Sequence, residues 1–237
     1  MRGAKAVPPA WMHRAKPVGL RAGKDEGEKM KAFLILEDGH VFAGKRIGSA
    51  REAVSEIVFN TSMTGYLEVL TDPSYSGQAV AMTYPLIGNY GICYEDMESD
   101  RPWADGFIVR ELSRMPDNFR SEDTIQNFLM KYDIPGICGI DTRALTRILR
   151  ESGTMNGMIT TDEHYRMEEV QRKLKAYATA DEVSKVSCRE KYVLPGDGYR
   201  VALLDLGAKR NIARSLHTRG CEVTVYPSFT PAEEIIA

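Results

Sequence analysis

A nearly continuous apolar run at residues 201–206 limits the fold more than any other feature of this sequence. A helical pattern at 211–219 follows it, Gly220 ends that pattern, and a second extended run occupies 222–226. Strand, helix and strand in this order predict a βαβ unit with parallel strands. A strand that is apolar on both faces needs cover on both and several neighbouring strands. Residues 199–237 are therefore expected to be the incomplete opening of an α/β domain.

A further helix is expected near the end of the sequence. Thr230 and Glu233 fit a capping box, and Pro231 stands at the favoured first helical position. The sequence stops at Ala237, about two turns into this helix. A fragment, a truncated gene product or a partial record would each give this pattern, so we expect a truncated chain.

Residues 30–160 have a different pattern, in which strands outnumber helices. Apolar residues at 32–36, the Asp38-Gly39 pair and an extended run at 40–43 predict a hairpin with a two-residue type I′ turn. Further extended runs, each bounded by Gly, Pro, Asp or Ser, lie at 57–61, 79–84, 106–112 and 157–160.

Two helices are expected between these strands. Ser121 is the predicted N-cap of the first and Asp141 of the second, and Gly153 ends the second. Each has an apolar stripe at helical spacing, formed by Ile125, Phe128, Leu129 and Tyr132 in the first and by Leu145, Ile148 and Leu149 in the second. Residues 30–160 therefore predict an α+β domain.

Two further segments complete the organisation. Residues 161–198 are expected to be a connector with one amphipathic helix, whose stripe is Met167, Val170, Leu174 and Tyr177. Residues 1–24 carry six Lys or Arg and no acid, and because residues 1–29 show no apolar period they predict a disordered leader. An organelle transit peptide is the alternative for that leader, and Met30 is a possible natural start.

Composition excludes several classes of function. Lys plus Arg total 31 against 33 for Asp plus Glu, and the net charge of −2 gives no global positive field for nucleic acid or anionic lipid. The four cysteines lie far apart without a Cys-x-x-Cys pair, which disfavours a zinc site and fits a reducing, cytoplasmic setting. No run reaches the roughly 18 apolar residues that span a bilayer. The sequon at Asn60 is then a chance match, since nothing indicates export.

Five long motifs occur in order along the chain. They are Phe-Asn-Thr-Ser-Met-Thr-Gly-Tyr at 59–66, Leu-Thr-Asp-Pro-Ser-Tyr at 70–75, Thr-Tyr-Pro-Leu-Ile-Gly-Asn at 83–89, Ile-Asp-Thr-Arg-Ala-Leu-Thr-Arg at 140–147 and Asp-Leu-Gly-Ala-Lys-Arg-Asn-Ile at 205–212. From about residue 30 to its end, the sequence resembles the small, glutamine-hydrolysing subunit of carbamoyl phosphate synthetase.

The resemblance implies a swivelling β/β/α domain at 30–160 and the start of a class I glutamine amidotransferase domain at 199–237. In that family a Cys-His-Glu triad releases ammonia from L-glutamine, with a thiolate as nucleophile and an oxyanion hole. The ammonia passes to a large subunit, the expected heterodimer partner, for arginine and pyrimidine biosynthesis. ATP and Mg²⁺ are expected on that large subunit, and this chain is expected to hold no cofactor and no metal.

No residue of this chain matches the triad of the family, so the chain alone is expected to be inactive. Cys138 lies in Gly-Ile-Cys-Gly-Ile, which imitates the Gly-Ile-Cys-Leu-Gly-His-Gln motif of the nucleophile, but the helix after Asp141 follows it directly. We interpret Cys138 as a small buried thiol at a strand end, and Cys221 as a core residue. None of the four histidines is placed as a base.

One substrate contact is implied by the resemblance. The Ser of the Asp-Pro-Ser-Tyr segment in that family reaches across a domain boundary to bound glutamine, and Ser74 occupies this position. Asp72 and Pro73 favour a tight turn that exposes the Ser74 hydroxyl. The polar residues at 60–64 are expected to cap a turn instead of binding a ligand.

Two other polar segments are expected to bind neither a metal nor a nucleotide. The acids at 95–100 lack calcium-loop spacing, and the loop at 207–211 lacks the phosphate-loop pattern.

The alternative to an amidotransferase subunit is a non-catalytic interaction module that docks on a large partner. If the gene continues into a Gly-Ile-Cys-Leu-Gly-His-Gln-like motif, the amidotransferase subunit is favoured over the interaction module.

Overall fold

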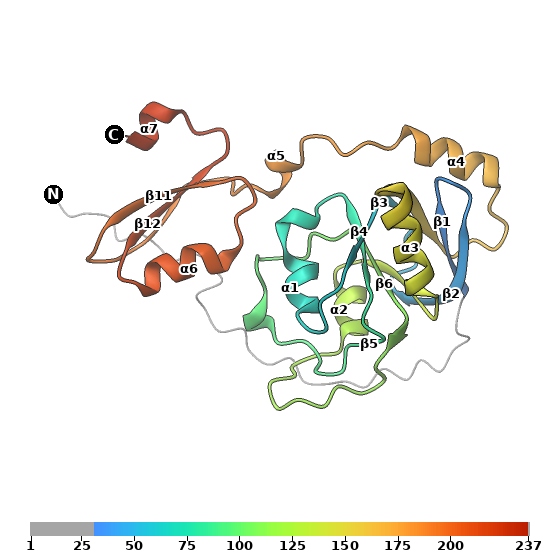
Figure 1. Ribbon diagram of the computed structural model, residues 1–237. Coiled ribbons are helices and arrows are strands. Elements are labelled where there is room, and N and C mark those ends of the chain that lie inside the picture. The colour runs from blue at the N-terminus through green and yellow to red at the C-terminus, as the bar shows by residue number, and fades with distance from the viewer. Residues whose placement is uncertain (1–30, 237) are drawn as a thin grey trace. The chain divides into compact units, whose positions relative to one another are not determined.

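The computed structural model describes residues 31–236, which form two compact units (Figure 1). We call the first the barrel unit (described residues 31–97 and 101–180) and the second the sheet unit (98–100 and 181–236). The predicted leader at 1–29, with Met30, lies outside the described residues.

Seven strands close into a barrel in the barrel unit, in the order β1-β2-β8-β6-β4-β3-β9. The neighbours β3 and β4, β4 and β6, and β6 and β8 are parallel, and the other pairs are antiparallel. The strands are β1 (Lys31–Leu36), β2 (Val41–Gly48), β3 (Ala53–Asn60), β4 (Gln78–Met82), β6 (Gly106–Val109), β8 (Pro135–Cys138) and β9 (Met155–Thr160). A separate parallel pair consists of β5 (Leu86–Ile87) and β7 (Glu111–Leu112).

The first hairpin is confirmed, but the predicted type I′ turn is wrong. The amide of Gly39 donates to the carbonyl of Leu36 (3.0 Å), and the amide of Leu36 donates to the carbonyl of His40 (2.8 Å). Gly39 has a φ of 95°, whereas Asp38 is not among the described residues with positive φ. A type I′ turn needs positive φ at both central residues, so this is the three-residue loop that ends in a left-handed glycine.

Strand side chains alternate between the barrel interior and two outer faces. Leu34, Ala79 and Ile108 come from different strands but share one buried cluster with Leu145 and Leu149. Contacts among strands on opposite sides of a closed barrel place this cluster inside it. Helix α3 (Thr142–Ser152), which supplies the two leucines, therefore closes the interior (Figure 1).

The outer faces are covered by three other helices. Val80 and Phe107 pack in a second cluster with residues of α1 (Tyr66–Thr71) and α2 (Ile125–Lys131). Ile35 and Met158 pack with Val170 and Leu174 of α4 (Met167–Ala176), as the apolar stripe of that helix predicted. A strand that is buried on both faces has a continuous run of apolar residues, which explains the extended runs in this part of the sequence.

Helix starts were predicted with mixed success. Asp141 is confirmed as the N-cap of α3, because its Oδ1 accepts from the amides of Arg143 and Ala144, both at 3.0 Å. Ser121 is wrong as the N-cap of α2, since Thr124 accepts from the amide of Asn127 (3.1 Å) instead. The Ser121 hydroxyl donates to the carbonyl of Asp123.

The sheet unit has three strands in the order β10-β12-β11, namely β10 (Tyr192–Leu194), β11 (Arg200–Asp205) and β12 (Glu222–Pro227). Strands β11 and β12 are parallel and joined by α6 (Arg210–Thr218), which confirms the predicted βαβ unit. Helices α5 (Glu182–Val186) and α7 (Ala232–Ile236) complete this unit.

Strand β11 buries one face only within the described part of the unit. Val201 and Leu203 pack in the core with Ala213 of α6, whereas Ala202 and Leu204 are exposed. The expected cover on both faces is therefore not seen among residues 31–236.

Both the backbone conformation at position 48 and the atoms around it require glycine. Its φ is 64°, and a Cβ there would lie 2.2 Å from the carbonyl oxygen of Ile134. Gly48→Ala is expected to lower the free energy of unfolding by about 2 to 5 kcal/mol, because left-handed strain and a backbone clash add. Urea denaturation measures this loss.

Gly139→Ala is the matched control, since Gly139 has a φ of 86° and a Cβ there would meet nothing within 4 Å. It should lose only about 1 to 2 kcal/mol from strain. Equal losses for the two variants would contradict the role of the Ile134 carbonyl.

Candidate functional site

The predicted contact residue Ser74 lies on a rigid turn of the barrel unit. Helix α1 ends at Thr71, a short 3₁₀ helix spans Pro73–Tyr75, and β4 follows. Asp72, which is 6% exposed, accepts a hydrogen bond at its Oδ1 from the amide of Ser74 (3.0 Å). Pro73 fits the first position because it needs no amide partner there. The predicted turn is confirmed, and it holds the Ser74 backbone in one conformation.

The Ser74 side chain is exposed, and its hydroxyl makes no hydrogen bond within residues 31–236. The neighbouring Tyr75 is tied to β3, because Asn60 Nδ2 donates to Tyr75 Oη (3.0 Å). A serine with a fixed backbone, whose hydroxyl the described residues leave unused, can both donate to and accept from a ligand.

Asn60 also organises the loop that follows β3. Its Oδ1 accepts from the amide of Ser62 (2.8 Å), which confirms the predicted turn cap. The Asn60 side chain thus connects the loop at 61–65 to the turn that carries Ser74.

Two stacked tyrosines fix the far end of this loop. The Tyr90 hydroxyl oxygen accepts from the amides of Gly65 (2.6 Å) and Tyr66 (3.3 Å), two backbone donors at the start of α1. The Tyr66 hydroxyl donates to the carbonyl of Gly91 (2.6 Å), and the two ring centroids lie 4.3 Å apart. Burial raises the pKa of both tyrosines, so they stay neutral.

Tyr75 and Tyr90 support this site, but neither was predicted to do so from the sequence. Both lie within or next to the long motifs, and a buried tyrosine hydroxyl normally has a partner. That rule could have marked them, although the identity of the partners depends on strand pairing.

In the sheet unit, Asp205 holds the loop that follows β11. This carboxylate is 8% exposed and accepts from the amides of Cys188 (2.7 Å), Gly207 (3.0 Å) and Ala208 (2.8 Å). Its lone pairs are used by the backbone, so the geometry supports the predicted structural loop over a nucleotide site.

The N-terminus of α6 already faces a carboxylate. Glu98 accepts at Oε1 from Asn211 Nδ2 (2.9 Å), and its carbonyl accepts from the amide of Arg210 (2.6 Å). A carboxylate there satisfies the helix dipole. Burial lowers the pKa of the Arg210 guanidinium, and Arg214 lowers it further.

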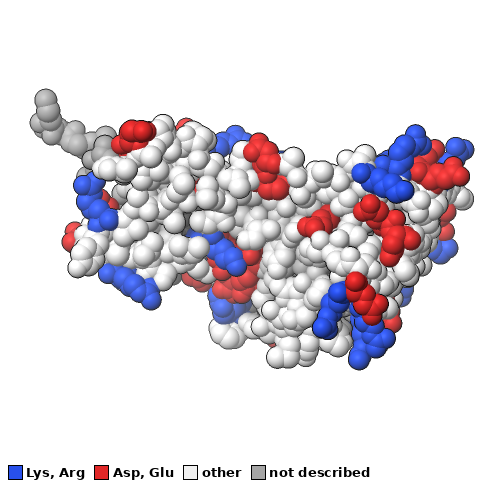
Figure 2. All heavy atoms as spheres, turned by 45° about the horizontal axis from the view of Figure 1, so that its top comes forward, with Lys and Arg blue, Asp and Glu red and all other residues white. Residues whose placement is uncertain are grey.

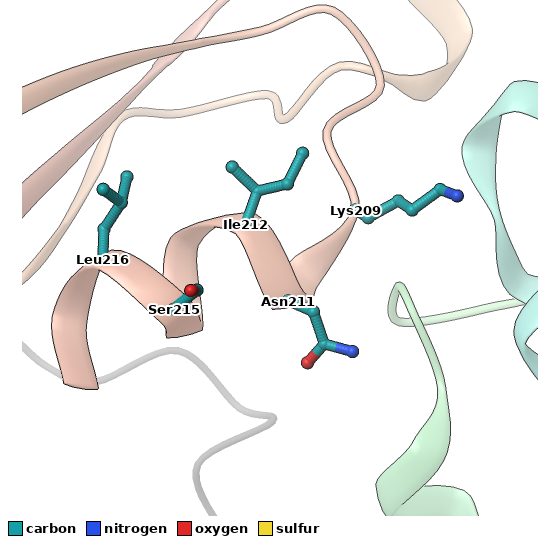
Figure 3. Close-up of a pocket in the computed structure, with 5 residues that line it drawn as sticks. All are labelled: Lys209, Asn211, Ile212, Ser215 and Leu216. Atoms are coloured by element: carbon teal, nitrogen blue, oxygen red, sulfur yellow. The ribbon is translucent and has the colours of Figure 1, made fainter. Parts of the chain in front are cut away.

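An open depression of about 450 Å³ lies along α6 (Figure 3). Ile212 and Leu216 point to one side of the helix, and Asn211 and Ser215 point to the other (Figure 3). The lining includes one charged group, Lys209, and no carboxylate, thiol or imidazole. This surface therefore has no acid and base pair for catalysis.

The cysteines are not arranged as nucleophiles. Burial raises the pKa of Cys93, although Arg120 Nη2 donates to its sulfur (3.2 Å). Burial, with Asp205 as the next cause, raises the pKa of Cys188 to about 12. Cys221 is confirmed as a core residue, and Cys138 lies at the end of β8 as predicted but is only half-buried. A reactive cysteine needs a lowered pKa.

The described histidines are not arranged for catalysis either. His40 Nδ1 contacts Asp38 (2.8 Å), and the buried Nδ1 of His217 has no hydrogen-bond partner. Among residues 31–236, no three His, Cys, Asp or Glu side chains are grouped to hold a metal ion. Within the same part of the chain, no helix combines the length and apolarity needed to cross a bilayer.

Comparison with known proteins identifies the class. Residues 34–159 match the family model described as carbamoyl-phosphate synthase small chain, CPSase domain. The chain therefore belongs to the carbamoyl-phosphate synthase small chain family, as its motifs predicted.

Individual relatives agree with this family. The chain is 55% identical over 207 residues to the carbamoyl phosphate synthase small chain of Clostridium perfringens, an alignment that covers 87% of this chain and 59% of that protein. It is 51% identical over 208 residues to the pyrimidine-specific small chain of Halalkalibacterium halodurans, covering 87% and 57%. The Bacillus caldolyticus small chain is 48% identical over 207 residues, covering 87% and 57%. The chain thus spans less than three fifths of the length of these relatives.

The pKa of Cys188 predicts slow alkylation. At about pH 8, iodoacetamide should label Cys188 far more slowly in the folded chain than in urea, because little thiolate is present. The rate should rise about tenfold per pH unit, without a plateau below about pH 10. Peptide mass spectrometry measures it. A plateau near pH 8.5, the usual thiol pKa, would contradict the assignment.

Proposed function

We propose that this chain contributes the small-chain role in a glutamine-dependent carbamoyl phosphate synthase, for arginine and pyrimidine biosynthesis in the cytoplasm. In this role L-glutamine is hydrolysed and its ammonia is supplied to a large chain that uses ATP. The observation that supports this most directly is the family match over 34–159, which includes the whole turn that carries Ser74.

We assign Ser74 as a contact of the glutamine substrate. Three properties support this role: its exposure, the fixed backbone of its turn, and a hydroxyl that residues 31–236 leave unpaired. Glutamine offers an amide and a charged amino acid group, and a hydroxyl can hydrogen-bond either.

The chain's own cysteines are assigned no catalytic role. Amide hydrolysis through a thiolate needs an activated cysteine beside a base and donors for the developing oxyanion. Cys93 and Cys188 have raised pKa values, and Cys221 is buried in a core. The contribution of residues 31–236 is then to bind and orient substrate and partner.

Ser74→Ala tests the substrate contact. The test protein joins this chain to the segment by which the Clostridium perfringens relative exceeds it, so that a glutaminase assay is possible. Ser74→Ala should raise the KM for glutamine about 3- to 10-fold with kcat nearly unchanged, because one neutral hydrogen bond is lost. Ser152→Ala, at an exposed serine at the end of α3, is the control. An unchanged KM for Ser74→Ala would refute the contact.

The chain alone is expected to release no ammonia from glutamine above a no-protein blank. A coupled glutamate dehydrogenase assay measures this release. Cys138→Ser should leave the result unchanged, because this half-buried thiol is assigned no catalytic role. Turnover that disappears in Cys138→Ser would overturn the assignment and make Cys138 the nucleophile.

A further inference from the structure

Helix α3 presents a row of three arginines to solvent. Arg143, Arg147 and Arg150 are all exposed, and their spacing of four and three residues places them on one face. The opposite face buries Leu145 and Leu149 in the barrel. The helix is thus anchored on one side and basic on the other.

These arginines have no partner within residues 31–236. None of their side chains makes an ion pair, a hydrogen bond or a ring contact there. Some other cations of the same unit are paired: Arg120 contacts Asp96 (2.7 Å) and Lys173 contacts Glu52 (2.6 Å). The row therefore differs from these paired basic side chains of the unit.

The fold gains little from this row, since only Arg150, in the last turn of the helix, lies where the helix dipole favours a positive charge. Like charges three or four residues apart on a helix destabilise it. Arg143 also lies in the first turn, where the helix dipole disfavours a positive charge. Helix stability therefore does not account for the row as a whole, and its exposure points to a role in binding.

The length of the row indicates what it binds. Seven residues at 1.5 Å rise separate Arg143 from Arg150 by roughly 10 Å along the helix axis. One carboxylate or phosphate group cannot contact guanidinium groups over that length, whereas a row of carboxylates on another protein can. Nucleic acid is disfavoured by the net charge of −2 and by a surface on which many basic side chains lie beside acidic ones (Figure 2).

We propose that Arg143, Arg147 and Arg150 form a docking surface for a row of Asp and Glu side chains on the large chain. This inference rests on the proposed function, which supplies that partner. Helix α3 is suited to the task because its Asp141 cap and buried leucines fix the helix that carries the arginines before contact. Arginine pairs well with carboxylates, since its planar group can bind one bidentately.

The test measures binding of the full chain to the large chain of the same organism by calorimetry. Changing the three arginines together to Gln should weaken binding at least tenfold at low salt and flatten its salt dependence. Arg147→Glu alone should weaken binding more than Arg147→Gln, because it adds repulsion. The matched control changes Arg172, Lys175 and Arg189 to Gln, which removes three exposed charges elsewhere and should leave the affinity unchanged.

The outcomes separate this inference from the function. If the wild-type chain binds and the α3 triple variant binds equally well, the docking surface is wrong and the function stands. If both triple variants weaken binding equally, the row has no special role, and the inference is again wrong. If the wild-type chain does not bind the large chain, function and inference both fail. Arginine-dependent binding of duplex DNA in place of the large chain would also overturn the proposal. Circular dichroism checks that each variant is folded.

Discussion

Closure of the barrel around small side chains is the constraint on which the rest of the barrel unit depends. Gly44, Gly106 and Gly157 face the interior, where a Cβ would lie under 3 Å from neighbouring atoms. Together with Ala79 and Ala81 they leave room for the leucines of α3. Larger residues would displace that helix, together with the exposed arginines on its other face.

Local sequence patterns were sufficient for most barrel strands and for the βαβ unit, because strand and helix periodicity are set by which faces are buried. Strands β8 and β10 were not among the predicted runs, and β3 begins at Ala53, four residues before the predicted run. Local patterns failed where a distant residue decides the local structure. Helix α1 was not predicted: it starts at Gly65, and its first amides depend on the Tyr90 hydroxyl. The start of α2 moved to Thr124 for a related reason, because the carbonyl of Asp123 pairs with Ile92 and keeps the preceding segment extended.

The candidate site likewise has a part that the sequence predicted and a part that it did not. The turn at Asp72 follows from adjacent residues and could be predicted, whereas the role of Ser74 came from a resemblance to a family. The bond between Asn60 and Tyr75 joins residues 15 apart, and it requires that β3 and β4 pair in parallel with Asn60 opposite Met82. Pairing register is a property of the whole barrel, so no local pattern could reveal this support.

The same environment that stabilises the two units makes their thiols poor nucleophiles. A thiolate needs positive charge or amide donors and access to solvent, but Cys188 lies beside the Asp205 carboxylate in a partly buried position. Asp205 cannot easily be moved, because it accepts three backbone amides that shape the loop before α6. Activation of Cys188 would therefore require loss of that loop. Cys188 is therefore poorly suited to act as a nucleophile, and the capped turn and the anchored helix of the barrel unit are better suited to positioning than to reaction.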